Sequence, residues 1–307
     1  MPARSSETQG LRARAGGRRD PRLISVVVPV LDAANTLSDL LRSLRDQDYR
    51  GEWELIVADN GSSDASVEIA QRWAGRFRRG RVVEASGRTS AGHARNAGAA
   101  HAEGDFLAFT DADDVPQPNW LSGLAQVARH GDLVAGAVDA DGLSSELSRS
   151  WHSSPPRKRA LDGFGFLTFA SGTNTGVWTD VFDELGGFDE EMVSGEDIEF
   201  SWRAQLCAFS VVAAPGAVVQ ERLRERVAPL VRQHYRYGTA GPNLYRRFRD
   251  AGMPRPRPSQ SLRAWGLILC SWPAAALSRR AMGRWALEAS LAAGRLDASL
   301  RNRVMFV

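Results

Sequence analysis

Three aspartates, Asp111, Asp113 and Asp114, lie within four positions directly after the stretch 106–110, which is apolar or small throughout. Carboxylates this close repel one another and raise one another's pKa unless a positive charge lies among them. Mg²⁺ and Mn²⁺ prefer one or two carboxylates together with phosphate oxygens and water. The cluster therefore indicates either a solvated acidic turn or a site for a divalent cation that also holds a phosphate-bearing ligand.

The pattern Asp-x-Asp is weak evidence by itself because it occurs three times, at Asp46/Asp48, Asp111/Asp113 and Asp139/Asp141. The first pair ends an amphipathic helical pattern, so a solvated helix face explains it. The third pair also follows an apolar strand and stays a competitor. The second pair is favoured because Asp114 follows it and because Asp59 ends another predicted strand.

Strands and helices alternate along the first half of the chain. Apolar runs predict strands over 23–30, 53–59, 81–86, 106–111 and 133–138. Helical spacing predicts helices over 35–47, 64–77 with Asp64 as N-cap, 90–103 and 119–130. This alternation is typical of an α/β fold with a doubly wound, mostly parallel sheet and helices on both faces. Ligands bind at the carboxyl ends of such strands, so Asp59, Asp111 and Asp113 are expected at one edge.

The pattern changes after residue 138. Residues 139–165 read as a long irregular loop, 195–209 as a helix and 210–215 as a last strand. We expect a disordered basic tail over 1–22, one α/β domain over 23–221 and a basic helical extension over 222–307.

Charge is distributed unevenly among these parts. Residues 1–22 carry a net charge of +4, residues 23–221 carry −14 and residues 222–307 carry +13. The acidic middle suits a cation, and the basic end suits either an anionic membrane surface or the acidic domain itself. Both alternatives stay open, and nucleic acid is not an expected partner.

Two cysteines provide no disulfide framework or zinc site and fit a reducing cytoplasm. The five histidines have no metal-ligand spacing. The apolar stretch 264–277 is too short to cross a membrane and contains Pro273, so it predicts a buried or interfacial helix. We expect a cytoplasmic protein that is either free or peripheral on the inner face of the cell membrane.

Four segments in order resemble the family 2 glycosyltransferases, which are inverting enzymes of the GT-A fold. They are ISVVVPVLDAANTLSDLLRSL, LIVADNGSSDAS, SAGHARNAGAAHAEGDFLAFTDADD and GTNTGVW…LGGFDEEMVSGEDIEFSWR. The resemblance covers residues 23–215 and depends on the ordered set, since no single segment is specific. It implies a GT-A-like domain with a nucleotide half over 23–138 and an acceptor half over 139–221.

The resemblance also implies roles for individual residues. Asp197 matches the catalytic base, and Asp113 with Asp111 matches the site of a Mn²⁺ or Mg²⁺ ion that bridges the diphosphate. The residues that match the nucleotide site are Pro29, Asp59, Arg95, Asn96 and Asp111. Further candidates are Asp114, Glu196, Asn174 and His234, the last with its neighbours 235–237 as a cover for the diphosphate.

For two sets of these residues, a purely structural role is an alternative to a role in the site. Arg95 fits a helix-surface charge as well as a nucleotide contact. Glu196, Asp197 and Glu199 fit a solvated helix face on which Glu199 pairs with Arg203 at i,i+4.

The implied reaction is transfer of one sugar from a nucleotide-sugar donor to a hydroxyl acceptor, such as a lipid-linked or cell-envelope precursor. The chain departs from its relatives at Leu31 and Asp32, where an aromatic residue and Asn are common, and at Trp178, where a basic residue is common. A nucleotidyltransferase or a dinucleotide-dependent oxidoreductase would need a Gly-rich loop after the first strand, and residues 30–37 contain no glycine. A catalytically silent binding relative of the same fold stays open.

Overall fold

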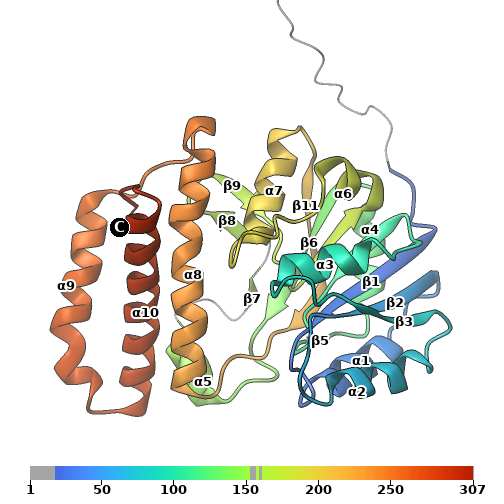
Figure 1. The fold of residues 1–307 in the computed structure, drawn as a ribbon, viewed down its shortest axis with the longest axis horizontal. Helices are drawn as coiled ribbons and strands as arrows, with labels where there is room; N and C mark the ends of the chain where they lie inside the picture. The colour runs from blue at the N-terminus through green and yellow to red at the C-terminus, as the bar shows by residue number, and fades with distance from the viewer. Residues whose placement is uncertain (1–17, 153–156, 159–160, 307) are drawn as a thin grey trace, which may run out of the picture.

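A mixed nine-stranded sheet forms the centre of the computed structural model, which describes residues 18–152, 157–158 and 161–306 (Figure 1). Its strands run in the order β3-β2-β1-β4-β10-β6-β11-β5, with β7 beside β6. The bounds are β1 (Leu23–Val30), β2 (Glu52–Asp59), β3 (Gly80–Glu84), β4 (Phe106–Phe109), β5 (Val115–Pro116), β6 (Leu133–Asp139), β7 (Arg157–Lys158), β10 (Thr175–Trp178) and β11 (Val211–Gln220). The predicted mostly parallel α/β sheet is confirmed.

The helices of the first half lie where their apolar spacing predicts them. They are α1 (Leu37–Arg45), α2 (Ser66–Ala74), α3 (Ala91–Ala99) and α4 (Trp120–Ala128). The expected N-cap of α2 is off by one residue, because Ala65 takes that position. Asp64 instead accepts the N–H of Ser66 at 2.9 Å, so its carboxylate still satisfies a donor of the first turn.

Strand β10 is the main feature that the sequence pattern did not predict. It lies between β4 and β6 and runs antiparallel to both, whereas β1 pairs in parallel with β2 and β4. Four residues, one of them Gly176, provide too little periodicity to indicate a strand. Because β10 is antiparallel, its N-terminal end meets the carboxyl ends of its neighbours.

The segment predicted as an irregular loop over 139–165 contains regular structure. It includes α5 (Glu146–Trp151), β7 and β8 (Leu161–Gly163), which pairs with β9 (Leu167–Phe169). Two further helices follow, α6 (Thr179–Leu185) and α7 (Glu196–Leu206). Strand β11 extends beyond the predicted end at residue 215, because a shift in register between Ala214 and Val218 lets pairing with β6 continue to Gln220.

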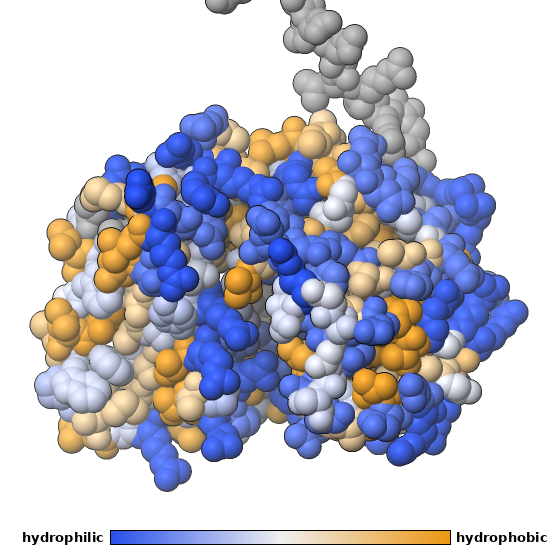
Figure 2. Space-filling model, in the orientation of Figure 1, coloured by the Kyte–Doolittle hydropathy of each residue, from blue (hydrophilic) through white to orange (hydrophobic). Residues whose placement is uncertain are grey.

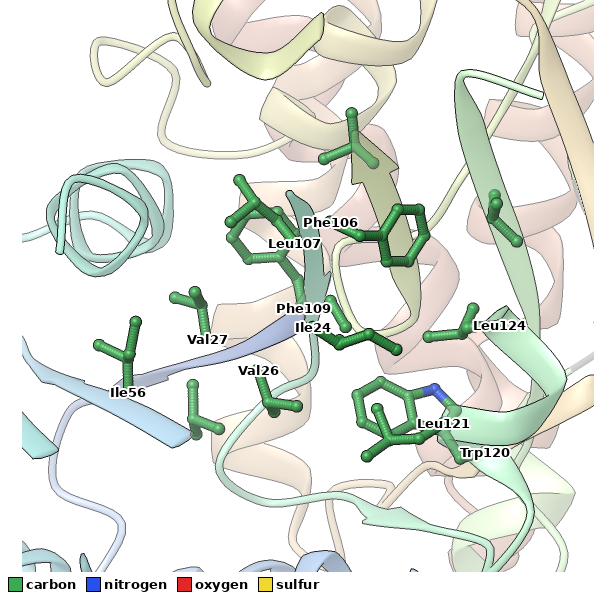
Figure 3. Packing of buried hydrophobic residues seen from close by; sticks show 14 of the residues in the cluster. Ile24, Val26, Val27, Ile56, Phe106, Leu107, Phe109, Trp120, Leu121 and Leu124 are labelled. Carbon is green, nitrogen blue, oxygen red and sulfur yellow. The ribbon is translucent and has the colours of Figure 1, made fainter. Parts of the chain in front are cut away.

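The main hydrophobic core occupies both faces of the sheet. Ile24 and Val26 point toward Trp120 and Leu121 of α4, whereas Val27 lies on the opposite side (Figure 3). Successive side chains of a strand alternate between faces, so a strand that is apolar at nearly every position needs helices on both sides. Helix α3 packs against β1 and β2. The continuous apolar run 23–30 thus has the surroundings that its pattern predicts.

The predicted helical extension is confirmed. It consists of α8 (Val227–Phe248), a short 3₁₀ turn η1 (Arg249–Ala251), α9 (Pro258–Ala275) and α10 (Arg279–Arg301). Helix α8 joins the domain through a second core that includes Met192, Trp202, Leu244 and Phe306. Helix α10 packs between α8 and α9, and α9 forms the outer edge of the molecule (Figure 1). Within the described part of the chain, every helix is too short or too polar to cross a bilayer.

The N-terminal tail was predicted to cover residues 1–22, of which the structure describes residues 18–22. Residues 1–17 lie outside the described residues, so that part of the prediction is not tested. Arg18 donates to Asp132 at 2.8 Å and to Asp180 at 2.9 Å, and Arg22 donates to Asp105 at 3.0 Å. These ion pairs hold residues 18–22 against the domain.

Candidate active site

Arg95 of α3 lies at the centre of the carboxylates that gather beside the sheet. Its guanidinium donates from Nη2 to Oδ1 of Asp111 at 2.7 Å and from Nη1 to Oε1 of Glu196 at 2.8 Å. The side chain is only 3% exposed and packs over the ring of Phe188. Although burial lowers the pKa of Arg95, Asp111 and Glu196 raise it by more, so the group stays charged. The surface-charge alternative for Arg95 is therefore wrong.

The loop before β10 completes the contacts of these carboxylates. Thr173 donates its hydroxyl to Oδ2 of Asp111 at 2.9 Å, and the N–H of Gly172 donates to Oδ2 of Asp197 at 2.9 Å. Because β10 runs antiparallel to its neighbours, the loop at its N-terminal end lies at the carboxyl ends of β4 and β6. The unpredicted strand thus positions the side chain that matches the catalytic base.

Asp197 lies in the first turn of α7, where backbone N–H groups contact its carboxylate. Its Oδ1 accepts the N–H of Ile198 at 2.8 Å, so both oxygens are oriented. Burial and the neighbouring Glu196 raise the pKa of Asp197 to about 6, while Gly172, Arg95 and Ile198 act in the opposite direction. A carboxylate with this pKa is ionised at neutral pH and is a stronger proton acceptor than an ordinary aspartate.

The start of α7 depends on Gly195. This residue has φ of +84°, in the left-handed region that disfavours residues with a Cβ. A Cβ there would also lie 2.9 Å from Cβ of Ala240 on α8. Glu199, two positions beyond Asp197, pairs with Arg203 at 2.9 Å as the helix-face alternative expected, but Glu199 is buried instead of solvated.

Asp113 pairs with an arginine from the segment that follows β11. Arg224 Nη1 lies 3.1 Å from Asp113 Oδ2, and Arg222 Nε donates to the carbonyl of Asp113 at 3.1 Å. Burial and Asp111 raise the pKa of Asp113, whereas Arg224 lowers it. Asp114 is buried, accepts the N–H of Arg222 at 3.0 Å, and has its pKa raised well above the usual value by burial and by Asp113.

The donor set of this cluster fits a hard cation that is partly coordinated by a ligand. Among the described residues, no three His, Cys, Asp or Glu side chains converge as a complete protein cage. Mg²⁺ and Mn²⁺ do not need such a cage where phosphate oxygens fill the remaining positions. The carboxylates of Asp111 and Asp113 provide oxygen ligands, and the positive charge now beside Asp113 belongs to Arg224.

The other two Asp-x-Asp pairs have local partners. Asp46 pairs with Arg45 at 2.8 Å on the exposed end of α1, as a solvated helix face predicts. Asp139 Oδ1 accepts the N–H of Asp141 at 2.9 Å, and Asp141 pairs with Arg149 at 3.2 Å near the surface. Of the three pairs, Asp111/Asp113 is the one that contacts Arg95.

Asp59 and Pro29 lie at the ends of neighbouring parallel strands. Both are half-buried, and Pro29 pairs in register with Ala58. The carboxylate of Asp59 accepts the N–H groups of Gly61 and Ser62, each at 3.2 Å. Asp32, with φ of +48°, accepts the N–H of Ser63 at 2.8 Å and ties the loop after β1 to the loop after β2.

Two candidate residues are fully engaged within the protein. Asn96 donates to the carbonyl of Phe188 and to Glu190, both at 2.9 Å, and accepts the N–H of Phe188 at 2.9 Å. Asn174 is buried, accepts from Trp120 Nε1 at 2.8 Å and donates to the carbonyls of Ala137 and Ala217. In this structure both amides position the backbone around the site.

His234 lies on α8, outside the carboxylate cluster. Its Nδ1 lies 3.0 Å from the carbonyl of Leu230, and its ring contacts those of His152 and Tyr237. Tyr237, which is 47% exposed, lies nearer to the cluster, and partial desolvation together with Glu221, Asp111 and Asp197 raises its pKa. Of the segment 235–237, Arg236 and Tyr237 line the adjoining cavity.

A cavity of about 740 Å³ separates the carboxylate cluster from α8 and α10. Asp197, Glu196, Arg95 and Thr173 line one side. Five basic or aromatic residues line the other side, namely Arg224, Arg232, Arg236, Tyr237 and Arg295. Its volume is within the range of small-molecule sites, which commonly measure about 300–1,000 Å³.

The sequence missed Thr173, Arg222 and Arg224 as site residues. Composition marked residues 222–307 as basic, but it did not indicate which of 17 arginines reach the carboxylates. The available signal was the charge complementarity between the acidic domain and the basic end. Net charges indicate that the two parts attract each other, but they do not indicate which residues are in contact.

Comparison with known proteins agrees with the motifs. The family described as Glycosyl transferase family 2 matches residues 25–186, and Glycosyl transferase family group 2 matches residues 106–292. Glycosyltransferase AglE of Haloferax volcanii is 27% identical over 62% of this chain and 64% of its own length. The pre-mycofactocin glycosyltransferase of Mycobacterium tuberculosis is 28% identical over 80% of this chain and 53% of its own length. The chain thus spans only part of these relatives.

Solved structures share the fold. The mannosyltransferase PcManGT from Pyrobaculum calidifontis, in complex with GDP-Man and Mn²⁺, superposes with a TM-score of 0.59 at 20% identity over 92% of this chain and 89% of its own. TarS 1–349 of S. aureus, in complex with UDP-GlcNAc, superposes with a TM-score of 0.52 over 92% of this chain and 93% of its own. The GT-A fold is confirmed. Because the first family model covers more than half of the residues, the chain belongs to glycosyl transferase family 2.

Proposed function

We propose that this protein transfers one sugar, with inversion, from a nucleotide-sugar donor to a hydroxyl group of an acceptor. The observation that carries the proposal is Asp197, a carboxylate with both oxygens oriented and a raised pKa, at the wall of a ligand-sized cavity. Inversion needs a base on the side of the sugar opposite the leaving diphosphate. Asp197 would remove the proton of the acceptor hydroxyl as the acceptor oxygen attacks the anomeric carbon. General base catalysis of this kind raises the rate by about 10²–10⁴-fold.

The donor would bind along the carboxyl edge of β1, β2 and β4. Asp59 and Pro29 would contact the base of the nucleotide, and Asp111, held by Arg95 and Thr173, would face the ribose. Fixing Asp111 from two sides restricts its rotation, so the carboxylate is oriented before the donor arrives. Asn96 would contribute indirectly, through its hydrogen bonds to Phe188 and Glu190.

Asp113, with Asp111, would hold the Mn²⁺ or Mg²⁺ ion. The cation would neutralise negative charge on the departing diphosphate, as a Lewis acid and template. Arg224 would leave Asp113 when the cation binds and would face the phosphate oxygens. The Mn²⁺ in the PcManGT complex and the nucleotide sugars in the PcManGT and TarS complexes support this choice of ligands.

Release of nucleoside diphosphate from a panel of UDP- and GDP-sugars, with Mn²⁺, Mg²⁺ or EDTA, tests the proposal. We expect cation-dependent release from one donor and a loss of about 100-fold in Asp113→Asn, because one carboxylate ligand becomes neutral. Asp141→Asn is the matched control from the competing Asp-x-Asp pair and should keep its activity. Wild-type protein that binds no nucleotide with either cation would leave the silent-relative alternative in place of catalysis.

The pH dependence of this release follows from the pKa of Asp197. The base acts only when it is ionised, and its pKa is raised to about 6. We therefore expect kcat/KM to be level above pH 7 and to fall about tenfold per unit of pH below 6. Rates measured from pH 4.5 to 8 at fixed Mn²⁺ check this. A profile that stays level down to pH 4.5 would contradict the assignment of Asp197 as the base.

We also propose that α9 binds an anionic membrane surface, which would place the enzyme on the inner face of the cell membrane beside a lipid-linked acceptor. Leu262 and Leu269, two helical turns apart on α9, are 74% and 72% exposed, and Leu277, in the turn that follows α9, is 85% exposed. Apolar side chains are visible along α9 at the left edge of Figure 2. Residues 251–287 contain six arginines and no acidic residue. Exposed leucine and tryptophan beside arginine are typical of interfacial helices.

Co-sedimentation with phosphatidylcholine vesicles, with and without phosphatidylglycerol, tests this attachment. We expect binding that requires phosphatidylglycerol, weakens with salt and falls about tenfold or more in Leu262→Ser/Leu269→Ser/Leu277→Ser. The control Val193→Ser/Leu206→Ser/Leu300→Ser replaces exposed apolar residues elsewhere and should bind as wild type does. Equal binding by both triple variants would contradict a role for α9.

A further inference from the structure

Three arginines of the C-terminal helices face the cavity from the side opposite Asp197. Arg232 and Arg236 lie four residues apart on α8 and therefore on one face of that helix, and Arg295 lies on α10. The cavity lining that α8 and α10 contribute contains no carboxylate. This wall of the cavity is therefore strongly positive.

These three side chains lack the ion pairs that several other arginines of the extension form. No hydrogen bond or ion pair joins their guanidinium groups to another described residue. By contrast, six arginines of the extension pair with carboxylates, namely Arg222, Arg224, Arg247, Arg249, Arg280 and Arg301. Burial lowers the pKa of Arg295, and Glu288, the one acidic group that acts on it, lies beyond ion-pair distance. Of the three, Arg295 is half-buried, and guanidinium groups that line a cavity without an acceptor favour an external anion.

The helices hold these arginines rigidly. Gly238 of α8 lies against the backbone of Leu291, and Gly294 of α10 lies against the backbone of Tyr235, so closely that a Cβ at either position would overlap the partner helix. This contact is backbone to backbone at two places along the pair. Arg236 and Arg295 therefore project from a fixed frame, and little backbone ordering is needed when an anion binds.

The position of the arginines indicates which ligand they meet. Asp197 lines the cavity, but Asp111 and Asp113 do not. In the proposed function, the donor diphosphate would have its own positive partners, namely the cation at Asp113 and Arg224, which lies beside Asp113. The three positive charges of these arginines exceed what one carboxylate would neutralise. They match the negative charge and the several oxygens of a phosphate or pyrophosphate.

We propose that Arg232, Arg236 and Arg295 form a subsite for a phosphate or pyrophosphate group carried by the acceptor. This inference rests on the proposed transferase function and adds the chemical class of the acceptor. The anionic group would anchor the acceptor at the α8–α10 wall, so that its hydroxyl lies toward Asp197.

Calorimetric titration of the full chain with inorganic pyrophosphate, in the presence of saturating UDP or GDP and Mn²⁺, tests the subsite. With the donor site filled, we expect wild type to bind pyrophosphate and Arg236→Gln/Arg295→Gln to bind it at least about tenfold more weakly. The matched control Arg246→Gln/Arg263→Gln removes the same charge from exposed positions outside the cavity and should bind as wild type does. Thermal melting verifies that each variant is folded.

Equal pyrophosphate affinity in the two double variants would overturn the proposal, and so would absence of pyrophosphate binding to wild type. A parallel loss of UDP or GDP affinity in Arg236→Gln/Arg295→Gln would also overturn it, because the arginines would then belong to the donor site. If wild type binds neither nucleotide with Mn²⁺, the transferase function fails instead, and titration of the nucleotide-free variants still decides the role of the arginines.

Titration with farnesyl phosphate and glucose 1-phosphate separates the two sources of such an acceptor. Both carry the proposed anionic group, and we expect both to lose affinity in Arg236→Gln/Arg295→Gln. Tighter binding of farnesyl phosphate would identify a lipid-linked acceptor, and equal binding would identify a soluble phosphorylated glycan. Binding of either one that does not depend on the arginines would contradict the proposal.

Discussion

Asp197→Asn is expected to lose about 10³-fold or more in sugar transfer while it keeps its affinity for nucleotide and cation. An amide cannot accept the acceptor proton, and general base catalysis contributes about 10²–10⁴-fold. Asn retains one oxygen, which can accept from either Gly172 or Ile198. The substitution also removes the charge of Asp197. Because burial and Glu196 raise the pKa of this carboxylate, its ionised form disfavours the folded state at neutral pH. The melting temperature should consequently stay within a few degrees of wild type.

Two measurements separate loss of the base from loss of the site. Nucleotide affinity with Mn²⁺ should match wild type, and the activity that remains should no longer fall below pH 6. Glu191→Gln is the matched control, because Glu191 is an exposed carboxylate in the segment that leads to α7. If Asp197→Asn transferred sugar within tenfold of the wild-type rate, another group would have to be the base.

Arg95→Gln is expected to destabilise the fold by about 3–5 kcal/mol, because it removes one partner from a buried ionic cluster. Asp111 and Glu196 would each lose a charged donor at 2.7–2.8 Å, and their mutual repulsion with Asp197 would no longer be balanced. Arg95 lowers the pKa of Asp197, so its loss should also raise that pKa above about 6. Urea unfolding monitors the first effect, and the pH midpoint of the residual activity monitors the second.

A second substitution makes this prediction specific. Adding Glu196→Gln to Arg95→Gln removes one of the uncompensated charges, so the double variant should recover part of the lost stability. Arg72→Gln, which replaces an exposed arginine on α2, should change the free energy of unfolding by less than about 0.5 kcal/mol. A loss in Arg95→Gln no larger than in Arg72→Gln would mean that the cluster does not support the fold.

The parts of the fold that the sequence predicts have strong local patterns. The run 23–30 is apolar at nearly every position, and α1 repeats leucine at helical spacing. Each pattern therefore predicts its element without information on the elements that pack against it. Asp59 could be placed at the ligand edge for the same reason, because it ends such a run. Strand β10 has only four residues and is defined by its neighbours, so no local pattern marks it.

The site was predicted less completely because its contacts join distant parts of the chain. Arg95 meets Glu196 across 101 positions, and Arg222 meets Asp113 across 109. Periodicity indicates which face of an element is buried, but it does not indicate which charge that face will meet. The ordered motifs supplied Asp111 and Asp197 through resemblance to a family, whereas Arg224 lies outside the four segments. Thr173 lies within the fourth segment, but the resemblance gave it no role.

The hydrogen bonds of Asn96 affect how the domain unfolds. Asn96 belongs to the nucleotide half of the sequence, yet its amide holds Phe188 and Glu190 of the acceptor half, beside the His93–Glu190 contact at 2.7 Å. Neither half can open without breaking these bonds, so the two should exchange their amide protons with solvent as a single cooperative unit. The division at residue 138 into a nucleotide half and an acceptor half, which the resemblance implies, is therefore not expected to be a boundary between folding units.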